Sequence, residues 1–130
     1  MEDRFKRQGM ISWHELMTGD VEGAKKFYTE LLGWTLEEFP MEEGESYWVV
    51  KVGDEGVGGI MGTPPEAAGV PPHWGLYITV DNVDATVKKA EKIGAKALVP
   101  PTDIPKVGRF AVLQDPQGAA FAVIRYAAEM

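Results

Sequence analysis

Apolar residues in the first half of the chain follow two different periods, and the change between them marks the predicted elements. Residues 11–18 form a short, apolar-rich run that ends at Gly19-Asp20, which predicts a strand. After Asp20, a good helix N-cap, apolar residues recur at helical spacing as far as Gly33, a residue typical of helix ends. Three further strands complete the order βαβββ, and they are predicted at 34–39, 46–52 and 57–61.

The second half of the chain repeats this order. A strand is predicted at 74–80, and either Asn82 or Asp84 can cap the helix that follows it. Gly94 ends that helix. The last three strands are predicted at 95–99, 109–114 and 119–126.

A single sequence offset relates the two halves. Moving by 62 residues places Asp20 on Asn82 and the turn glycine Gly56 on Gly118, although the helix ends need a slip of one residue. Such agreement indicates a duplicated unit. We expect internal repeat modules at about 9–63 and 73–126, joined by an exposed Pro- and Gly-rich connector. Since modules of this size are marginal alone, we expect one domain over residues 1–130.

Composition narrows the classes of function. The net charge of −7 argues against binding of nucleic acid or of an anionic membrane surface, because both need clustered Lys and Arg. The absence of cysteine excludes disulfides, thiolate metal sites and cysteine nucleophiles. The N-terminal residues are charged and no long apolar run follows them, so we expect no signal peptide, no membrane span and a cytoplasmic location.

Two motifs resemble those of a known superfamily. The first is D-x-x-x-(A/S)-x-x-FY-x-x-x-LG, which runs here from Asp20 to Gly33, and the second is "DPQGAAFAVI" in the last strand pair. With the paired βαβββ order, the chain resembles the vicinal oxygen chelate superfamily, and within it the small single-domain glyoxalase-like group. That superfamily includes glyoxalase I, bleomycin-resistance and fosfomycin-resistance proteins and extradiol dioxygenases. The resemblance implies an α+β fold of two tandem βαβββ modules, whose curled mixed sheets form one open, cup-shaped cavity.

The resemblance also implies where a metal would bind. Metal-dependent members hold a divalent ion with His and Glu side chains on the strands that face the cavity. By motif position and repeat, the four ligand positions fall at Trp13, Gly75, Ile60 and Ala122. None of these side chains can coordinate a cation. We therefore predict no metal and no other cofactor, with a divalent metal at other residues as the alternative.

His14 and Glu15 are adjacent, and strand alternation decides whether they can form a metal site of their own. Successive side chains point to opposite faces, so the two cannot ligate one ion unless the strand is bulged. By resemblance, the face of Trp13, Glu15 and Met17 looks into the cavity, and His14 looks toward the helix. A carboxylate in an apolar cavity must stay hydrated, find a donor or take up a proton. Glu15 therefore either makes a structural hydrogen bond to a Trp, a Tyr or a backbone N–H, or serves as a general base.

His73 lies on the same predicted face as Gly75 and Tyr77, near the cavity mouth. It is either an acid–base or ligand-binding group or a loop histidine that follows "VPP". Glu15 and His73 are the strongly titratable pair that the register places inward. They are therefore the catalytic candidates, and the candidate ligands of a displaced metal.

The same register predicts an apolar, aromatic-lined ligand pocket. Concave apolar surfaces with a few polar groups are the usual form of small-molecule sites, and aromatic walls favour a planar or hydrophobic ligand. The predicted lining consists of Trp13, Glu15, Met17, Trp48, Val50, Ile60, His73, Gly75, Tyr77, Phe110, Val112 and Ala122.

Three functions are open from the sequence. The first is a metal-independent module that binds a small hydrophobic or aromatic molecule. The second is a glyoxalase-like lyase or isomerase, or a dioxygenase, which uses Glu15 and His73 with a displaced metal or in metal-free acid–base chemistry. The third is a regulatory or interaction role in which the pocket is filled. By analogy with the superfamily, a homodimer is also expected.

Overall fold

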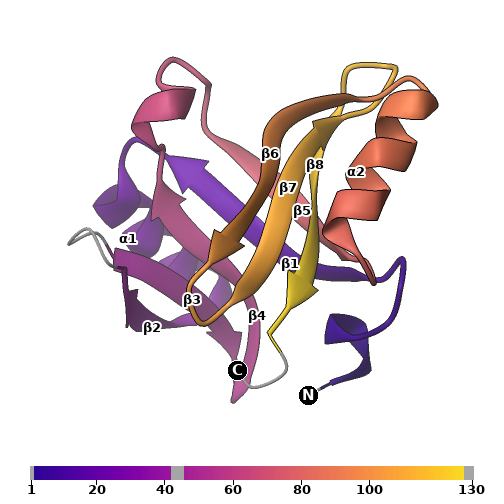
Figure 1. The fold of residues 1–130 in the computed structure, drawn as a ribbon. Helices are drawn as coiled ribbons and strands as arrows, with labels where there is room; N and C mark the ends of the chain where they lie inside the picture. The colour runs from indigo at the N-terminus through magenta and orange to yellow at the C-terminus, as the bar shows by residue number, and fades with distance from the viewer. Residues whose placement is uncertain (1, 42–45, 128–130) are drawn as a thin grey trace. The chain divides into compact units, whose positions relative to one another are not determined.

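The computed structural model describes residues 2–41 and 46–127 (Figure 1). The chain divides into two compact units. The first unit is Trp13–Gly75, and the second joins the N-terminal segment up to Ser12 with the chain from Leu76 onward. Each unit has its own helix, strands and hydrophobic core.

The first unit contains the predicted order βαβββ. Its strands lie in the order β2-β3-β4-β1, with β1 parallel to β4 and the other neighbours antiparallel. A short 3-10 helix, η2, follows the last strand. The elements are β1 (Ile11–Thr18), α1 (Val21–Leu32), β2 (Thr35–Pro40), β3 (Ser46–Val52), β4 (Glu55–Gly62) and η2 (Pro65–Ala67).

The second unit repeats the order after a short 3-10 helix, η1. Its strands lie in the order β5-β8-β7-β6, with β5 parallel to β8. Helix α2 lies along one face of this sheet (Figure 1). The elements are η1 (Asp3–Phe5), β5 (His73–Thr79), α2 (Val83–Lys92), β6 (Lys96–Ile104), β7 (Gly108–Gln114) and β8 (Ala120–Tyr126).

The helices begin where the polar pattern predicts. The carboxylate of Asp20 accepts a hydrogen bond from the backbone N–H of Gly23 at 2.9 Å, and the side chain of Asn82 accepts one from Ala85 at the same distance. Of the two caps that the sequence allowed for α2, Asn82 is the one used. Gly33 ends α1 with a φ of 73°, the left-handed conformation that glycine adopts without strain.

Strand β6 is longer than the sequence predicted. The prediction ended at residue 99, whereas the strand continues through Pro100 and Pro101 to Ile104. Proline cannot donate to a ladder, so it is confined to edge strands, bulges and strand starts. Strand β6 is the last in its sheet order and its pairing with β7 is irregular here, which explains why the prolines are tolerated.

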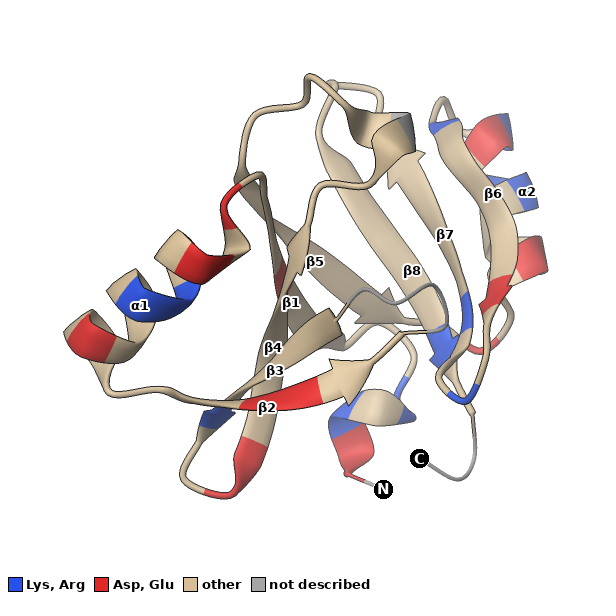
Figure 2. Cartoon of the chain, turned by 90° about the vertical axis from the view of Figure 1, so that its left-hand side faces the viewer, with Lys and Arg blue, Asp and Glu red and all other residues tan. Residues whose placement is uncertain are grey.

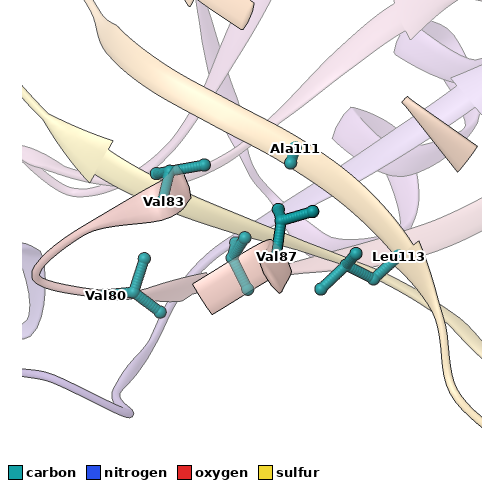
Figure 3. Packing of buried hydrophobic residues seen from close by; sticks show 6 residues of the cluster. Val80, Val83, Val87, Ala111 and Leu113 are labelled. Atoms are coloured by element: carbon teal, nitrogen blue, oxygen red, sulfur yellow. The ribbon is translucent and has the colours of Figure 1, made fainter. Parts of the chain in front are cut away.

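Both sheets pack an apolar face against their own helix. In the second unit, residues of α2, β7 and β8 form one core cluster around Val87 (Figure 3). In the first unit, Leu16, Val50 and Ile60 are buried, and Ala24 and Tyr28 of α1 pack on them. Over the residues that the structure describes, no helix is long and apolar enough to cross a membrane.

Candidate functional site

Three side chains of the first unit form a hydrogen-bonded chain on the sheet face opposite α1. The indole Nε1–H of Trp13 donates to the hydroxyl of Tyr47 at 2.8 Å. That hydroxyl in turn donates to Oε1 of Glu15 at 2.8 Å. Trp13 and Glu15 alternate with Leu16, which packs toward α1, so they lie on the other face. We call this group the Trp–Tyr–Glu cluster.

One glycine of β4 makes room for this cluster. Glu15 pairs with Gly59, and a Cβ built at Gly59 would overlap the hydroxyl of Tyr47. A Cβ at Gly56 would instead lie at an ordinary contact distance, 3.7 Å, from Cη2 of Trp13. The ring of Tyr47 can therefore lie over β4 because residue 59 has no side chain.

Glu15 is buried, with only 7% of its surface exposed. A buried carboxylate is costly unless donors satisfy it, and Tyr47 supplies one of them. This is one of the structural hydrogen bonds that the sequence left open. An ionised carboxylate only accepts hydrogen bonds, through about four lone-pair directions. A molecule that binds Glu15 in that form must therefore present a hydroxyl or N–H donor.

Trp48, Val50 and Ile60 lie on the opposite face from the cluster, so their predicted place beside Trp13 and Glu15 is wrong. Ile60 pairs with Leu16, and Val50 and Ile60 are buried together with Leu16 beneath α1. The ammonium of Lys25 in α1 lies 3.3 Å from the ring centroid of Trp48. These three side chains contribute to the core of the first unit.

A one-residue error in the repeat offset caused this reversal. Glu15 corresponds to Tyr77 at the offset of 62, and the structure pairs Glu15 with Gly59 and Tyr77 with Ala122. The counterpart of Ala122 is therefore Gly59, at an offset of 63, and not Ile60. Shifting a strand by one residue moves every side chain to the other face.

The reason for the changed offset is local. Val49 pairs with Gly59 and Val112 pairs with Ala122, so β3 and β7 already correspond at an offset of 63, before the turn that follows them. The extra residue is in β6: Glu37 and Phe39 of β2 pair with Val49 and Tyr47, whereas Val99 and Thr102 of β6 pair with Val112 and Phe110. Turn lengths and bulges can differ between two repeats. A single sequence offset therefore does not predict which residues correspond on both sides of such a difference.

In the second unit, four of the predicted pocket residues share the face opposite α2. Tyr77 pairs with Ala122, which pairs with Val112 on its other side. The rings of Tyr77 and Phe110 have centroids 6.5 Å apart. Ala111 and its neighbours alternate to the face that packs on α2. That this face binds a ligand stays a prediction.

The two histidines are both exposed. His14 lies on the face opposite Glu15, with Nδ1 3.5 Å from the carbonyl oxygen of Val57. Nδ1 of His73 lies 2.9 Å from the carbonyl oxygen of Pro71, which makes Nδ1 the protonated nitrogen of that ring in its neutral form. This hydrogen bond holds the His73 ring against the connector that precedes β5, two residues before Gly75.

The residues at the implied metal positions do not fit a divalent ion. With Gly59 in place of Ile60, the positions hold Trp13, Gly59, Gly75 and Ala122, whose side chains carry no ligand atom. Met17 lies on the same face as Glu15, opposite Met61, and adds only a weak thioether acceptor. Within residues 2–41 and 46–127, no three His, Asp or Glu side chains gather into a metal-binding group.

Sequence reasoning missed Tyr47. Once Trp48 was placed inward, alternation put Tyr47 outward, and its hydroxyl was not considered as the partner of Glu15. One signal was available: Gly58-Gly59 removes bulk from β4, and a large side chain on a neighbouring strand can occupy the space over a glycine. The structure assigns that space over Gly59 to Tyr47.

A family model shows to which family this chain belongs, and several known proteins are similar to it. Residues 10–123 match the model of the Glyoxalase/Bleomycin resistance protein/Dioxygenase superfamily. The putative glyoxylase CFP32 of Mycobacterium tuberculosis (strain CDC 1551 / Oshkosh) is 45% identical over 117 residues, which cover 90% of this chain and 44% of that protein. The anthracycline biosynthesis protein DnrV of Streptomyces peucetius is 31% identical over 129 residues, with 90% of this chain and 47% of that protein covered. The chain thus spans somewhat less than half the length of these relatives.

Solved structures share the fold at low identity. Methylmalonyl-CoA epimerase from Mycobacterium tuberculosis has a TM-score of 0.67 at 16% identity, covering 98% of this chain and 93% of that one. The hypothetical protein BH1468 from Bacillus halodurans C-125 has a TM-score of 0.71 at 12% identity, covering 95% and 99%. At such identities the likeness is one of fold.

Proposed function

We propose that this chain, which belongs to the Glyoxalase/Bleomycin resistance protein/Dioxygenase superfamily, binds a small hydrophobic or aromatic molecule at its Trp–Tyr–Glu cluster. The observation that carries the proposal is the hydrogen-bonded chain from Trp13 through Tyr47 to Glu15. It joins two aromatic rings to a carboxylate on one sheet face. Such a combination suits a ligand that has an aromatic body and one donor group.

The aromatic rings and the carboxylate of the cluster would contact different parts of the ligand. The rings of Trp13 and Tyr47 are half-buried and offer apolar faces and edges for packing. Glu15 offers acceptors for a hydroxyl or amine, and Tyr47 holds one of its oxygens in place. An anthracycline contains fused aromatic rings with hydroxyl groups, so the name of the relative DnrV supports a ligand of this class.

Calorimetry with a panel of small aromatic compounds tests the proposal. The panel pairs each phenol, aniline and hydroxylated polycyclic compound with an analogue that lacks the donor group. We expect a donor-bearing member to bind, and Glu15→Gln to weaken its binding about tenfold or more, because the amide donates where the carboxylate accepted. His14→Gln is the matched control, since it changes the adjacent residue on the opposite face. If the affinity depended neither on the donor group of the compound nor on the Glu15→Gln change, the proposed site would be refuted.

Acid–base catalysis is the second candidate function, as in a glyoxalase-like lyase or isomerase. The buried, hydrogen-bonded carboxylate of Glu15 favours it, because a general base needs a fixed position beside the substrate. His73 is the partner that the sequence suggests. A divalent metal does not fit the family's positions in this chain, so no step is assigned to one. Metal content of the purified protein, with Glu15→Gln and His73→Ala beside it, tests the form of this enzyme that uses a displaced metal: a stoichiometric ion lost in either variant would favour that form.

The predictions of a homodimer and of a cytoplasmic location are part of the same proposal. Light scattering tests the first, and fractionation of the cells that make the protein tests the second.

A further inference from the structure

The sheet face that carries the Trp–Tyr–Glu cluster has one negative charge in excess. Glu37 on β2 pairs with Val49 on β3, and Figure 2 shows the acidic stretch of β2 to which Glu37 belongs. Val49 and Glu15 both pair with Gly59, so the two carboxylates lie in one row across this face. The ammonium of Lys51 lies 3.2 Å from the carboxylate of Glu37 and compensates it. Lys51 is the only Lys or Arg among the described strand residues of the first unit.

The two carboxylates of this row differ in their exposure to water. The side chain of Glu37 is 68% exposed, whereas Glu15 as a residue is 7% exposed. Water and salt screen an exposed charge, and they screen a buried one much less. The hydroxyl of Tyr47 also fixes the position of one oxygen of Glu15. A charged group that enters the cluster therefore interacts with Glu15 far more strongly than with Glu37.

We propose that the donor group of the ligand is a protonated amine, so that the molecule bound at the Trp–Tyr–Glu cluster is an aromatic organic cation. This inference rests on the proposed function and narrows its ligand from any donor-bearing aromatic compound to one class. An ammonium group donates hydrogen bonds to a carboxylate and also compensates its negative charge. Hydrogen bonds between two ionised groups are shorter and roughly twice as strong as those between neutral ones.

The two rings of the cluster favour a ligand of the same charge. The face of an aromatic ring is negative, so Trp and Tyr attract a cation within about 6 Å of the ring centroid. Nε1 of Trp13 and Oε1 of Glu15 each lie 2.8 Å from the hydroxyl of Tyr47, which brings both rings next to the carboxylate. An ammonium group bound to Glu15 is thus close to two aromatic rings, and the aromatic body of the ligand packs beside them.

The same charges disfavour the other classes of aromatic ligand. A carboxylate or phosphate group at the cluster would be placed beside Glu15, and like charges at a poorly hydrated position repel strongly. The net charge of −7 adds a long-range repulsion of anions and attraction of cations. A neutral hydroxyl compound keeps a hydrogen bond to Glu15 and gains nothing from either effect.

Three compounds with one aromatic body test the sign of the charge. Naphthylmethylamine is protonated at neutral pH, naphthylmethanol carries a neutral hydroxyl at the same place, and naphthylacetate carries a carboxylate. Calorimetry measures the binding of each to the full chain at neutral pH and physiological ionic strength. We expect the amine to bind about tenfold more tightly than the alcohol, and the carboxylate to show no binding.

Two variants that each remove one negative charge from this face locate the effect. Glu15→Gln should abolish most of the tenfold preference for the amine over the alcohol. Glu37→Gln is the matched control and should leave that preference within about twofold, because Glu37 is exposed and paired with Lys51. Circular dichroism checks that both variants are folded. The comparison of amine with alcohol on the wild type needs no variant.

The outcomes separate this inference from the proposed function. An alcohol that binds as tightly as the amine would overturn the inference and leave the proposed function standing. A preference for the amine that survives Glu15→Gln, or that Glu37→Gln reduces equally, would also overturn it, because the attraction would then come from the charge of the whole chain. A chain that binds none of the three compounds would contradict the proposed function as well.

Discussion

The hydroxyl of Tyr47 lies 2.8 Å from Oε1 of Glu15 and donates a hydrogen bond to it, although 32 residues separate the two in the chain. The contact spans three strands of the first unit, because Tyr47 is on β3, Glu15 is on β1, and β4 runs between them. It is possible only because Gly59 of β4 has no side chain. The geometry of the carboxylate and the aromatic ring therefore depends on a glycine.

Tyr47→Phe should destabilise the protein by about 1–3 kcal/mol, because a buried carboxylate loses a donor and the Trp13 indole loses its acceptor. Urea unfolding measures this change. A double-mutant cycle with Glu15→Gln should give a coupling of roughly 0.5–3 kcal/mol, as residues in direct contact do. Strictly additive effects would mean that the two side chains do not interact in solution.

Gly59→Ala should act on the ligand site through Tyr47. The added methyl group occupies the position of the Tyr47 hydroxyl, so the ring must move away from Glu15. We expect a loss of ligand affinity, measured by calorimetry. Gly19→Ala is the control, since a Cβ at Gly19 meets nothing within 4 Å. Unchanged affinity in Gly59→Ala would show that the position of Tyr47 does not matter for binding.

Substitutions of Trp13 and of Trp48 should affect different properties, ligand affinity in the first case and the free energy of unfolding in the second. Trp48 packs with α1 and Lys25, so Trp48→Leu should lower the free energy of unfolding by about 1–3 kcal/mol and leave ligand affinity within twofold. Trp13→Leu should weaken binding by a larger factor, because it removes a ring of the cluster. If the two variants affected binding equally, the assignment of the two faces would be incorrect.

The stability of the second unit should depend on acid pH through Asp84. The Arg109 guanidinium donates hydrogen bonds to both oxygens of Asp84, at 2.8 and 2.9 Å, and this holds the pKa of Asp84 below its ordinary value of 3.8. A lowered pKa in the folded state means that stability is fully present above pH 3.8 and is lost as the pH falls through the folded pKa. Asp84→Asn should therefore flatten the fall in unfolding midpoint between roughly pH 5 and pH 2.

Asp54→Asn, in the turn between β3 and β4, is the control for that experiment. It should follow the wild-type curve. If the unfolding midpoint of Asp84→Asn fell at acid pH as steeply as that of the wild type, the ion pair with Arg109 would be excluded as the cause of the fall.

Much of the fold could be predicted from the sequence because local rules determine it. Asp20 and Asn82 cap helices, Gly33 ends one, and the repeated order of elements follows from hydrophobic period and turn residues. The faces of β3 and β4 could not be transferred from the second repeat, because β6 has one residue more than β2 at an irregular pairing that no local pattern specifies. This one-residue error in the offset placed Trp48 and Ile60 on the wrong face in the prediction. It also placed Tyr47 on the face away from Glu15.

The candidate site was predicted in part for the same reason. Glu15 and Trp13 are on β1, whose face follows from its own alternation, and the structure places both in the cluster. Tyr47 comes from a strand whose face depends on long-range pairing. Side chains that meet across strands are fixed by tertiary structure, so one sequence does not determine which of them meet.

The indole N–H signal of Trp13 in a nitrogen–proton NMR spectrum tests the central claim most directly. The four indole signals are assigned with single Trp→Phe variants, and a hydroxylated aromatic compound is then titrated into the protein. Binding at the Trp–Tyr–Glu cluster should shift the Trp13 signal in a saturable way, and Glu15→Gln should suppress the shift, while the Trp48 signal moves little. A Trp13 signal that stays fixed while a compound binds elsewhere would contradict the account.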